Sequence, residues 1–180
     1  MQAVFFYFLA FIKICVKIIF MENFVNSMPS KNNIKATYES YKPVLSEIMT
    51  KIEEKLRKTI KLASNPTYKS RVKSFNSYYR KVLRLKSDEA EKNNFVELTD
   101  MMGIRVICAF LEDLSEVEKQ IKENFVVKEV EYKGAQQSFR EFGYESVHVL
   151  VSIPADCMPE RCELPLPESL VCEIQIRTIL

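Results

Sequence analysis

The chain has 180 residues, of which 47% are hydrophobic and 28% are charged, as is usual for a soluble globular domain with appendages. Its formal net charge of +2 excludes a strong overall positive field that would attract nucleic acid, so local basic clusters must carry any anion binding. The five cysteines are odd in number, and Cys108 and Cys172 lie in apolar, strand-like runs where free thiols are common. We therefore expect a reducing, cytoplasmic location.

Residues 1–20 form an almost wholly apolar segment of about the length of a membrane span, interrupted by Lys13 and Lys17. No basic residue precedes this segment and no small-residue cleavage site follows it, which argues against a secretory signal. Three interpretations stay open: a start codon assigned too early, with Met21 or Met28 as the true start; a membrane anchor; or a helix packed on the domain or on a partner. We separate residues 1–30, an N-terminal extension, from the folded domain over residues 31–180.

Periodicity predicts the elements of the folded domain. An amphipathic helix is expected over residues 38–62, because apolar residues recur there at steps of three and four. A short strand over 68–73 follows, then Ser74 as the N-cap of a helix over 75–86, and a polar loop over 87–94. We next expect a short helix over 95–102, a buried strand over 104–110 and a helix over 114–125.

The last third of the chain is predicted to be rich in strands. Strands are expected over 126–132, 146–153 and 169–177, with a polar loop over 133–142 and a proline-rich loop before the last strand. Strands that alternate with helices and end in a joined pair indicate an α/β fold. The prediction is a mixed β-sheet of about five strands with helices packed on it.

Two carboxylates occupy positions where a sheet normally buries apolar groups. Asp100 precedes Gly103 at the entry to a buried strand, and Glu173 lies inside the last strand. By two-residue alternation, Glu173 shares one face with Gln175 and Arg177, and this face lines either a ligand site or solvent. Two carboxylates on separate strands also suit Mg²⁺, which binds through one or two carboxylates plus substrate phosphates.

The other face of the last strand is expected to be core. It carries three apolar residues, Cys172, Ile174 and Ile176. The chain stops two residues after Thr178, so the sequence offers no later helix to cover this face. We therefore expect an exposed apolar patch and self-association, as a homo-oligomer or an aggregate.

A basic cluster comes from three segments of the chain. Arg71 and Lys73 are two residues apart on one strand face, Lys81 lies two helical turns beyond Ser74, and Arg105 follows Gly103. Each side chain taken alone is more often a solvated charge. Together they suit a triphosphate, and an arginine plane can also stack on a base.

A second group of polar residues surrounds the strand predicted over 146–153. Gly143 permits a sharp turn, and Tyr144 follows it at the mouth of the proposed site. Ser146 and His148 share one face of the strand, and His148 is the only histidine of the chain. Taken alone, His148 is more often a hydrogen-bonded structural residue, and a tyrosine at a strand start is usually a packing residue.

The order and spacing of these motifs resemble the synthetase domain of the RelA/SpoT alarmone synthetases. Four segments carry the resemblance: Arg71-Val72-Lys73-Ser74, Asp100-Met101-Met102-Gly103-Ile104-Arg105, Gly143-Tyr144-Glu145-Ser146-Val147-His148 and Glu173-Ile174-Gln175-Ile176-Arg177-Thr178. The resemblance implies a nucleotidyltransferase-like domain of the small, single-domain type. It further implies Mg²⁺-dependent transfer of pyrophosphate from ATP to the 3′-hydroxyl of GDP or GTP, which makes (p)ppGpp and AMP for the stringent response.

The resemblance also implies roles for the metal and donor side. Asp100 would hold the magnesium, and Glu173 would help to hold it and deprotonate the attacking hydroxyl. Arg71 and Arg105 would sandwich adenine. The family pattern Arg-x-Lys-x-x-x-Ser-x-x-x-Lys is matched by Arg71, Lys73, Ser77 and Lys81. Lys73, Ser74 and Lys81 would then contact the ATP phosphates or support those contacts.

On the acceptor side, the resemblance implies that Tyr144 stacks on guanine. The remaining acceptor residues implied are Lys133, Arg140, His148, Gln175 and Arg177. Arg140 stands about where the family often has a lysine, which keeps the charge but changes the geometry.

Two departures from the family pattern keep alternatives open. Arg140 leaves the acceptor open, so an adenine nucleotide or the 3′ end of tRNA is an alternative to GDP or GTP. Family members continue after the last strand with a covering helix, so we expect a domain truncated at its C-terminus. A catalytically inactive nucleotide-binding module and a regulatory interaction protein are the remaining alternatives.

Overall fold

The computed structural model describes residues 30–85, 95–133 and 146–179. The predictions that concern residues 1–29, the polar loop over 87–94, Arg140 and Tyr144 lie outside the described residues. None of the helices within the described ranges is both long and apolar enough to cross a bilayer.

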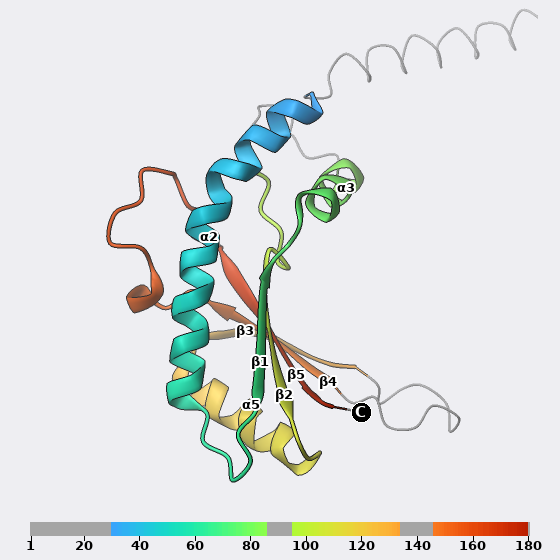
Figure 1. Cartoon of the computed structure of the whole chain (residues 1–180), viewed down its shortest axis with the longest axis vertical. Coiled ribbons are helices and arrows are strands. Elements are labelled where there is room, and N and C mark those ends of the chain that lie inside the picture. Colours follow the sequence, from blue (N-terminus) through green and yellow to red (C-terminus); the bar gives the residue numbers. More distant parts are fainter. Residues whose placement is uncertain (1–29, 86–94, 134–145, 180) are drawn as a thin grey trace, which may run out of the picture.

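The longest helix, α2 (Lys31–Thr59), runs beside the sheet (Figure 1). The helix begins at Lys31, seven residues before the predicted start, because Ser30 caps it and Ile34 extends the apolar stripe. The Ser30 hydroxyl accepts a hydrogen bond from the backbone N–H of Asn33 at 3.3 Å. The helix ends where the backbone N–H of Ile60 bonds to the carbonyl of Leu56 at 2.8 Å.

Five strands form one mixed sheet in the order β1-β2-β5-β4-β3 (Figure 1). Among the strands of the described residues, only β2 and β5 are parallel neighbours; the other three neighbouring pairs are antiparallel. All five strands were predicted, with ends shifted by at most two residues. Their bounds are β1 (Thr67–Val72), β2 (Met102–Cys108), β3 (Val127–Lys133), β4 (Ser146–Ser152) and β5 (Val171–Thr178).

Two further helices match the prediction in position. Helix α3 (Phe75–Leu85) follows β1, and helix α5 (Glu112–Asn124) connects β2 to β3. A short 3₁₀ turn, η1 (Ala155–Cys157), lies in the proline-rich loop. Figure 1 shows α2 and α5 on the same side of the sheet, which we call the core face, and α3 beyond the end of β1.

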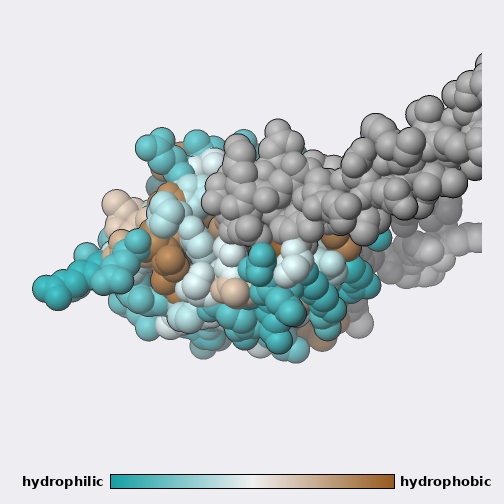
Figure 2. Space-filling view, turned by 90° about the horizontal axis from the view of Figure 1, so that it is seen from above, coloured by the Kyte–Doolittle hydropathy of each residue, from teal (hydrophilic) through white to brown (hydrophobic). Residues whose placement is uncertain are grey.

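The core face is lined by alternate residues of the central strands. Ile104 and Val106 of β2 are fully buried, as are Ile174 and Ile176 of β5. They form one cluster with the apolar stripes of α2 and α5. Seen along the long axis, most of the visible described surface is hydrophilic, with hydrophobic residues in one strip and in a few smaller patches (Figure 2).

The prediction of an exposed apolar patch on the last strand is wrong. Cys172, Ile174 and Ile176 are all at 0% exposure, within the cluster that α2 and α5 complete. The long helix at the start of the domain and the helix between β2 and β3 cover this face, so no later element is needed for it. The pattern along the last strand could not reveal which earlier helices pack there.

The predicted short helix over 95–102 is also wrong. The described segment before β2 has no helix, and it has a turn at Thr99 and Asp100. Phe95 stacks on Tyr78, with ring centroids 5.7 Å apart, and the backbone N–H of Val96 donates to the Tyr78 hydroxyl at 2.9 Å. Its apolar residues are therefore buried by packing on α2 and α3 rather than by forming a helical stripe.

Candidate active site

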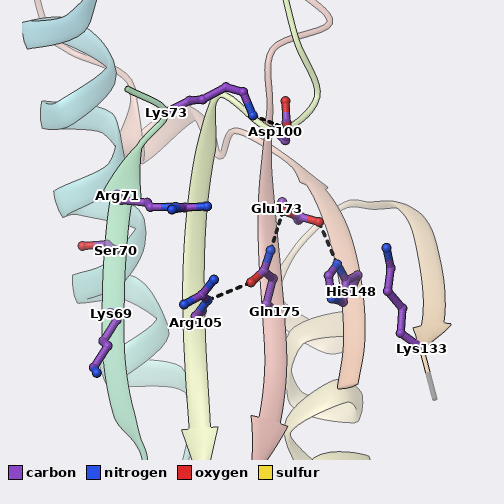
Figure 3. Close-up of a pocket in the computed structure, with 11 residues that line it drawn as sticks. Lys69, Ser70, Arg71, Lys73, Asp100, Arg105, Lys133, His148, Glu173 and Gln175 are labelled. Carbon is purple, nitrogen blue, oxygen red and sulfur yellow. Dashed lines mark hydrogen bonds and ion pairs between the residues drawn. The ribbon is translucent and has the colours of Figure 1, made fainter. Parts of the chain in front are cut away.

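The opposite face of the sheet, which we call the polar face, carries a cavity of about 430 Å³ (Figure 3). Strand register builds it: Arg71 pairs with Gly103, Gly103 pairs with Glu173, and Lys69 pairs with Arg105. Residues paired across a sheet point to the same side. The lining residues are Lys69, Ser70, Arg71, Lys73, Asp100, Gly103, Arg105, Lys133, His148, Glu173 and Gln175.

Asp100 lies in the turn that precedes β2 and is held by two lysines. Its Oδ2 atom is 2.6 Å from Nζ of Lys73, and its Oδ1 atom is 2.9 Å from Nζ of Lys81. Burial alone would raise the pKa of Asp100, but the hydrogen bonds and charges of the two lysines outweigh it and lower this pKa. The two lysines therefore favour the ionised form of the Asp100 carboxylate.

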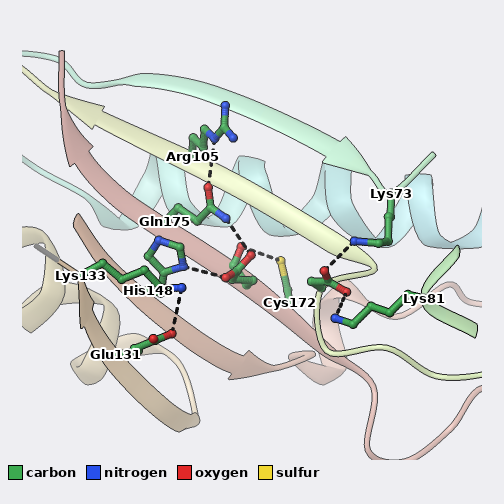
Figure 4. Close-up of polar contacts among 10 residues, drawn as sticks. Lys73, Lys81, Arg105, Glu131, Lys133, His148, Cys172 and Gln175 are labelled. Atoms are coloured by element: carbon green, nitrogen blue, oxygen red, sulfur yellow. Dashed lines mark hydrogen bonds and ion pairs between the residues drawn. The ribbon is translucent and has the colours of Figure 1, made fainter. Parts of the chain in front are cut away.

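Glu173 is at the centre of a second polar network, whose other members, Arg105, His148 and Gln175, are labelled in Figure 4. Its Oε1 atom lies 2.8 Å from Nδ1 of His148, and its Oε2 atom accepts a hydrogen bond from Nε2 of Gln175 at 2.7 Å. The Oε1 atom of Gln175 in turn accepts from Nε of Arg105 at 3.0 Å. Both Glu173 oxygens therefore have partners, which fixes the carboxylate toward the cavity.

Basic side chains surround the two carboxylates. Figure 3 shows Arg71 reaching from β1 across β2, Arg105 beside Gln175, and Lys133 on the far side of His148. Five lining residues are lysine or arginine and two are carboxylates, so basic groups outnumber acidic groups by three in the described lining. The cavity therefore favours an anion that carries several charges.

A second cavity of about 620 Å³ continues from the first along α3. The two cavities share Lys73 and Asp100. Its other lining residues are Ser77, Arg80, Lys81, Arg84 and Leu85. The spacing of Ser77, Lys81 and Arg84 puts them on one side of the helix, and all three line this second cavity.

The structure brings most of the predicted site residues together. Eight of them line the first cavity: Arg71, Lys73, Asp100, Arg105, Lys133, His148, Glu173 and Gln175. Lys81 lines the second cavity, while Ser74 and Arg177 line neither. The Ser74 hydroxyl instead donates to the hydroxyl of Ser77 at 3.1 Å. The roles of these residues stay predictions, as do those of Tyr144 and Arg140.

Three basic lining residues were missed from the sequence. Lys69 lies two residues before Arg71, so strand alternation could have placed it on the same face. Arg80 and Arg84 flank Lys81 on α3, and helical spacing could have placed Arg84 beside Ser77 and Lys81. Whether Arg80 and Arg84 line a cavity depends on how α3 packs on the rest of the domain, which no local pattern specifies.

The two carboxylates fit a magnesium ion. Asp100 and Glu173 line the same cavity, and carboxylate oxygens are the hard ligands that this ion prefers. Among the described residues, no group of three or more His, Cys, Asp or Glu side chains is placed to hold a metal. That donor set suits an ion that keeps water or phosphate ligands rather than one enclosed by protein.

Comparison with known proteins shows which protein family this chain is related to. Residues 70–180, more than half of the chain, match the family model described as the region found in RelA / SpoT proteins. GTP pyrophosphokinase YwaC from Bacillus subtilis is 33% identical over 111 residues, which make up 62% of this chain and 50% of YwaC. The match therefore spans about half the length of that curated relative.

Solved structures agree on the fold. Small alarmone synthetase 1 from Bacillus subtilis, bound to its product pppGpp, has a TM-score of 0.58 at 21% identity, over 79% of this chain and 74% of that chain. Small alarmone synthetase 2 from the same organism has a TM-score of 0.54 at 28% identity, over 79% of this chain and 72% of that chain. The mixed five-stranded sheet with its packed helices is the architecture of these synthetases, and the family match shows that the chain belongs to the RelA/SpoT family.

Proposed function

We propose that this chain is a GTP pyrophosphokinase, which transfers pyrophosphate from ATP to the 3′-hydroxyl of GDP or GTP. The products are AMP and (p)ppGpp, and (p)ppGpp is the signalling nucleotide of the stringent response. One observation carries the proposal: two carboxylates, Asp100 and Glu173, line a single cavity that is otherwise rich in basic groups. Phosphoryl-transfer sites need this combination, because the protein must position and neutralise phosphates rather than form covalent bonds to them.

The donor nucleotide would lie across β1 and β2. Arg71 and Arg105 come from these neighbouring strands, and both line the cavity. Their planar guanidinium groups can stack on the two faces of adenine. Lys73 and Lys81, at the junction of the two cavities, would then bind the phosphate chain, with Ser77 on the same side of α3.

The acceptor nucleotide would lie on the β4 and β3 side. Lys133 and His148 line this end of the cavity, and Tyr144 and Arg140 precede β4 in the sequence. Small alarmone synthetase 1, whose fold is similar, binds pppGpp as its product, which supports a guanine nucleotide here. Tyr144 would stack on the guanine base.

The reaction would take place beside Glu173. The 3′-hydroxyl oxygen of the acceptor attacks the β-phosphorus of ATP, and the bond from that phosphorus to the oxygen of the α-phosphate breaks. AMP leaves with the bridging oxygen, and Glu173 takes the hydroxyl proton, held in orientation by His148 and Gln175. Asp100 and Glu173 would hold magnesium, which when bound supplies electrostatic stabilisation of the phosphate charge.

The test is to incubate the full chain with magnesium and ATP labelled on its β- or γ-phosphate, with GDP, GTP, ATP or tRNA supplied separately. Label transferred to GDP or GTP, with release of AMP, is the expected result. Label in a pyrophosphorylated adenine nucleotide or on tRNA would assign the chain to the alternative acceptors. Tight ATP binding with no transfer to any acceptor would identify a nucleotide-binding module instead.

A further inference from the structure

The carboxylate of Asp100 and the ammonium groups of Lys73 and Lys81 are engaged with one another. Each Asp100 oxygen faces one lysine, at 2.6 and 2.9 Å. The Asp100 and Lys73 side chains are 32% and 17% exposed, so water screens their ion pair only partly. In the chain as it stands, the proposed metal ligand and the proposed phosphate ligands therefore neutralise each other.

These three groups have different partners in the proposed reaction. Asp100 is needed for a cation, and the two lysines are needed for phosphate oxygens. Each ammonium that stays on Asp100 is a donor withheld from the phosphates and a positive charge beside the place where a cation would bind.

We propose that the three groups exchange partners when the nucleotide binds, so that phosphate and divalent cation must enter the site together. Lys73 and Lys81 pass from Asp100 to the phosphate chain, and the freed carboxylate oxygens take the cation. This inference rests on the proposed function, because it takes a nucleotide triphosphate as the anionic ligand. It adds a rule of binding: neither the cation alone nor the phosphate chain alone binds well.

The charges of the cavity support this rule. A divalent cation that approaches Asp100 without phosphate meets two ammonium groups in contact with the same carboxylate, and basic groups outnumber acidic ones in the lining. Like charges a few Å apart in a partly buried site repel strongly. Phosphate reverses this balance, because it accepts charge-assisted hydrogen bonds from both lysines and adds oxygen ligands for the cation.

The local structure permits the exchange without moving the backbone. The backbone N–H of Lys73 donates a hydrogen bond to the backbone carbonyl of Met101 at 2.8 Å. This bond ties the chain just after β1 to the turn that carries Asp100. A lysine ammonium sits on a flexible four-carbon stem and can change partners by rotation of its side chain. The second cavity is lined by all three groups and gives the ammonium groups space to move.

Two binding measurements on the full chain test the exchange, and neither depends on turnover. Free Mn²⁺ is followed by electron paramagnetic resonance without nucleotide, and ATP is titrated calorimetrically with a metal chelator present. Lys73→Met and Lys81→Met should each bind Mn²⁺ about tenfold more tightly than the wild-type chain, because one repelling charge is gone. Both variants should bind metal-free ATP more weakly, so the two affinities change in opposite directions.

Lys133→Met is the matched control, since Lys133 lines the same cavity but its described ion pair is with Glu131, at 3.3 Å. Its affinity for Mn²⁺ should change much less. An equal gain in Lys133→Met would overturn the exchange in favour of a general charge effect. An unchanged or weaker Mn²⁺ affinity in both the Lys73 and Lys81 variants, with ATP still bound, would also overturn it while leaving the proposed function intact.

Failure of the wild-type chain to bind ATP, with or without metal, would overturn the proposed function and the exchange with it. Thermal melts check that each variant is folded. If Lys73→Met does not fold, Lys81→Met carries the test, because Lys81 lies on α3 with its side chain 39% exposed.

Discussion

The side-chain amide of Gln175 donates a hydrogen bond across 2.7 Å to Oε2 of Glu173. On its other side the same amide accepts from Arg105 at 3.0 Å, so a residue of the proposed adenine site is linked to the proposed base through one glutamine. The resemblance implies that Gln175 contacts the acceptor nucleotide, and that role stays a prediction. The contacts of Gln175 support a further role, the orientation of Glu173.

Gln175→Leu should lower kcat about tenfold to a hundredfold and change the KM for ATP far less. The reason is that a hydrogen bond to a charged group contributes about 1.5–3 kcal/mol, and about 1.4 kcal/mol corresponds to a factor of ten in rate. Steady-state kinetics with each substrate varied in turn measures kcat and the two KM values separately. Gln120→Leu is the control, since Gln120 bonds to Lys61 on the surface. An unchanged kcat with a raised acceptor KM would return Gln175 to acceptor binding.

Glu173→Gln should abolish transfer and leave ATP affinity within about tenfold of the wild-type value. A group that takes a proton during the reaction acts mainly in the transition state, so its loss affects rate more than ground-state binding. Transfer is measured with labelled ATP, and ATP binding by calorimetry. A variant that keeps more than about a tenth of the wild-type rate would show that Glu173 does not have this role.

Tyr144→Ala should raise the KM for the acceptor about 5- to 150-fold, with a much smaller change in the KM for ATP. Stacking of an aromatic side chain on a base contributes about 1–3 kcal/mol, which corresponds to this range. Tyr144→Phe keeps the ring and should stay close to the wild type. Equal weakening of both substrates in Tyr144→Ala would mean that Tyr144 has only a structural role.

The ion pairs of Asp100 should make stability depend on pH in the acid range. Its pKa is lowered in the folded chain from an ordinary value of 3.8. A carboxyl group whose folded pKa is depressed stabilises the fold above its unfolded pKa, and this stabilisation is lost as the pH falls through the folded pKa. The wild-type chain should therefore be more stable than Asp100→Asn at neutral pH, with a difference that shrinks below pH 3.8. Urea unfolding at a series of pH values measures it, and a difference independent of pH would contradict the assignment.

Removal of residues 1–20 should leave the melting temperature within about 4 °C, a shift that corresponds to about 1–2 kcal/mol in a domain of this size. The described core begins at Ile34, and Ser30 already caps α2. Solubility should improve, because the removed segment is apolar. Calorimetry of a chain that starts at Met21 checks this. Aggregation or loss of the cooperative transition would show that residues 1–20 belong to the core.

Strand alternation predicted part of the first cavity. Glu173 and Gln175 were placed on one face and Ile174 on the other, as the structure shows, because side chains of a strand alternate with a period of two whatever surrounds them. The amphipathic spacing of α2 likewise predicted a helix and its buried stripe. These features are local, so they can be read from neighbouring residues alone.

Tertiary packing determined what the local pattern could not. A short helix was predicted to begin at Phe95, but contacts of Phe95 and Val96 with Tyr78 hold them in a segment without regular secondary structure, because burial against other elements outweighs a weak helical preference. The apolar face of β5 has no local partner in the sequence, yet helices from earlier in the chain bury it.

By itself, the sequence determined the five strands, the polar face of the last strand and the residue types of the proposed site. Only the tertiary structure decided that β2 and β5 lie side by side in parallel, so that Gly103 pairs with Glu173 and brings Asp100 and Glu173 to one cavity. It also decided that two lysines from other parts of the chain meet at Asp100, Lys73 from just after β1 and Lys81 from α3. The physical reason is that local periodicity fixes the direction of a side chain relative to its own backbone, whereas the identity of its neighbours depends on how distant elements pack.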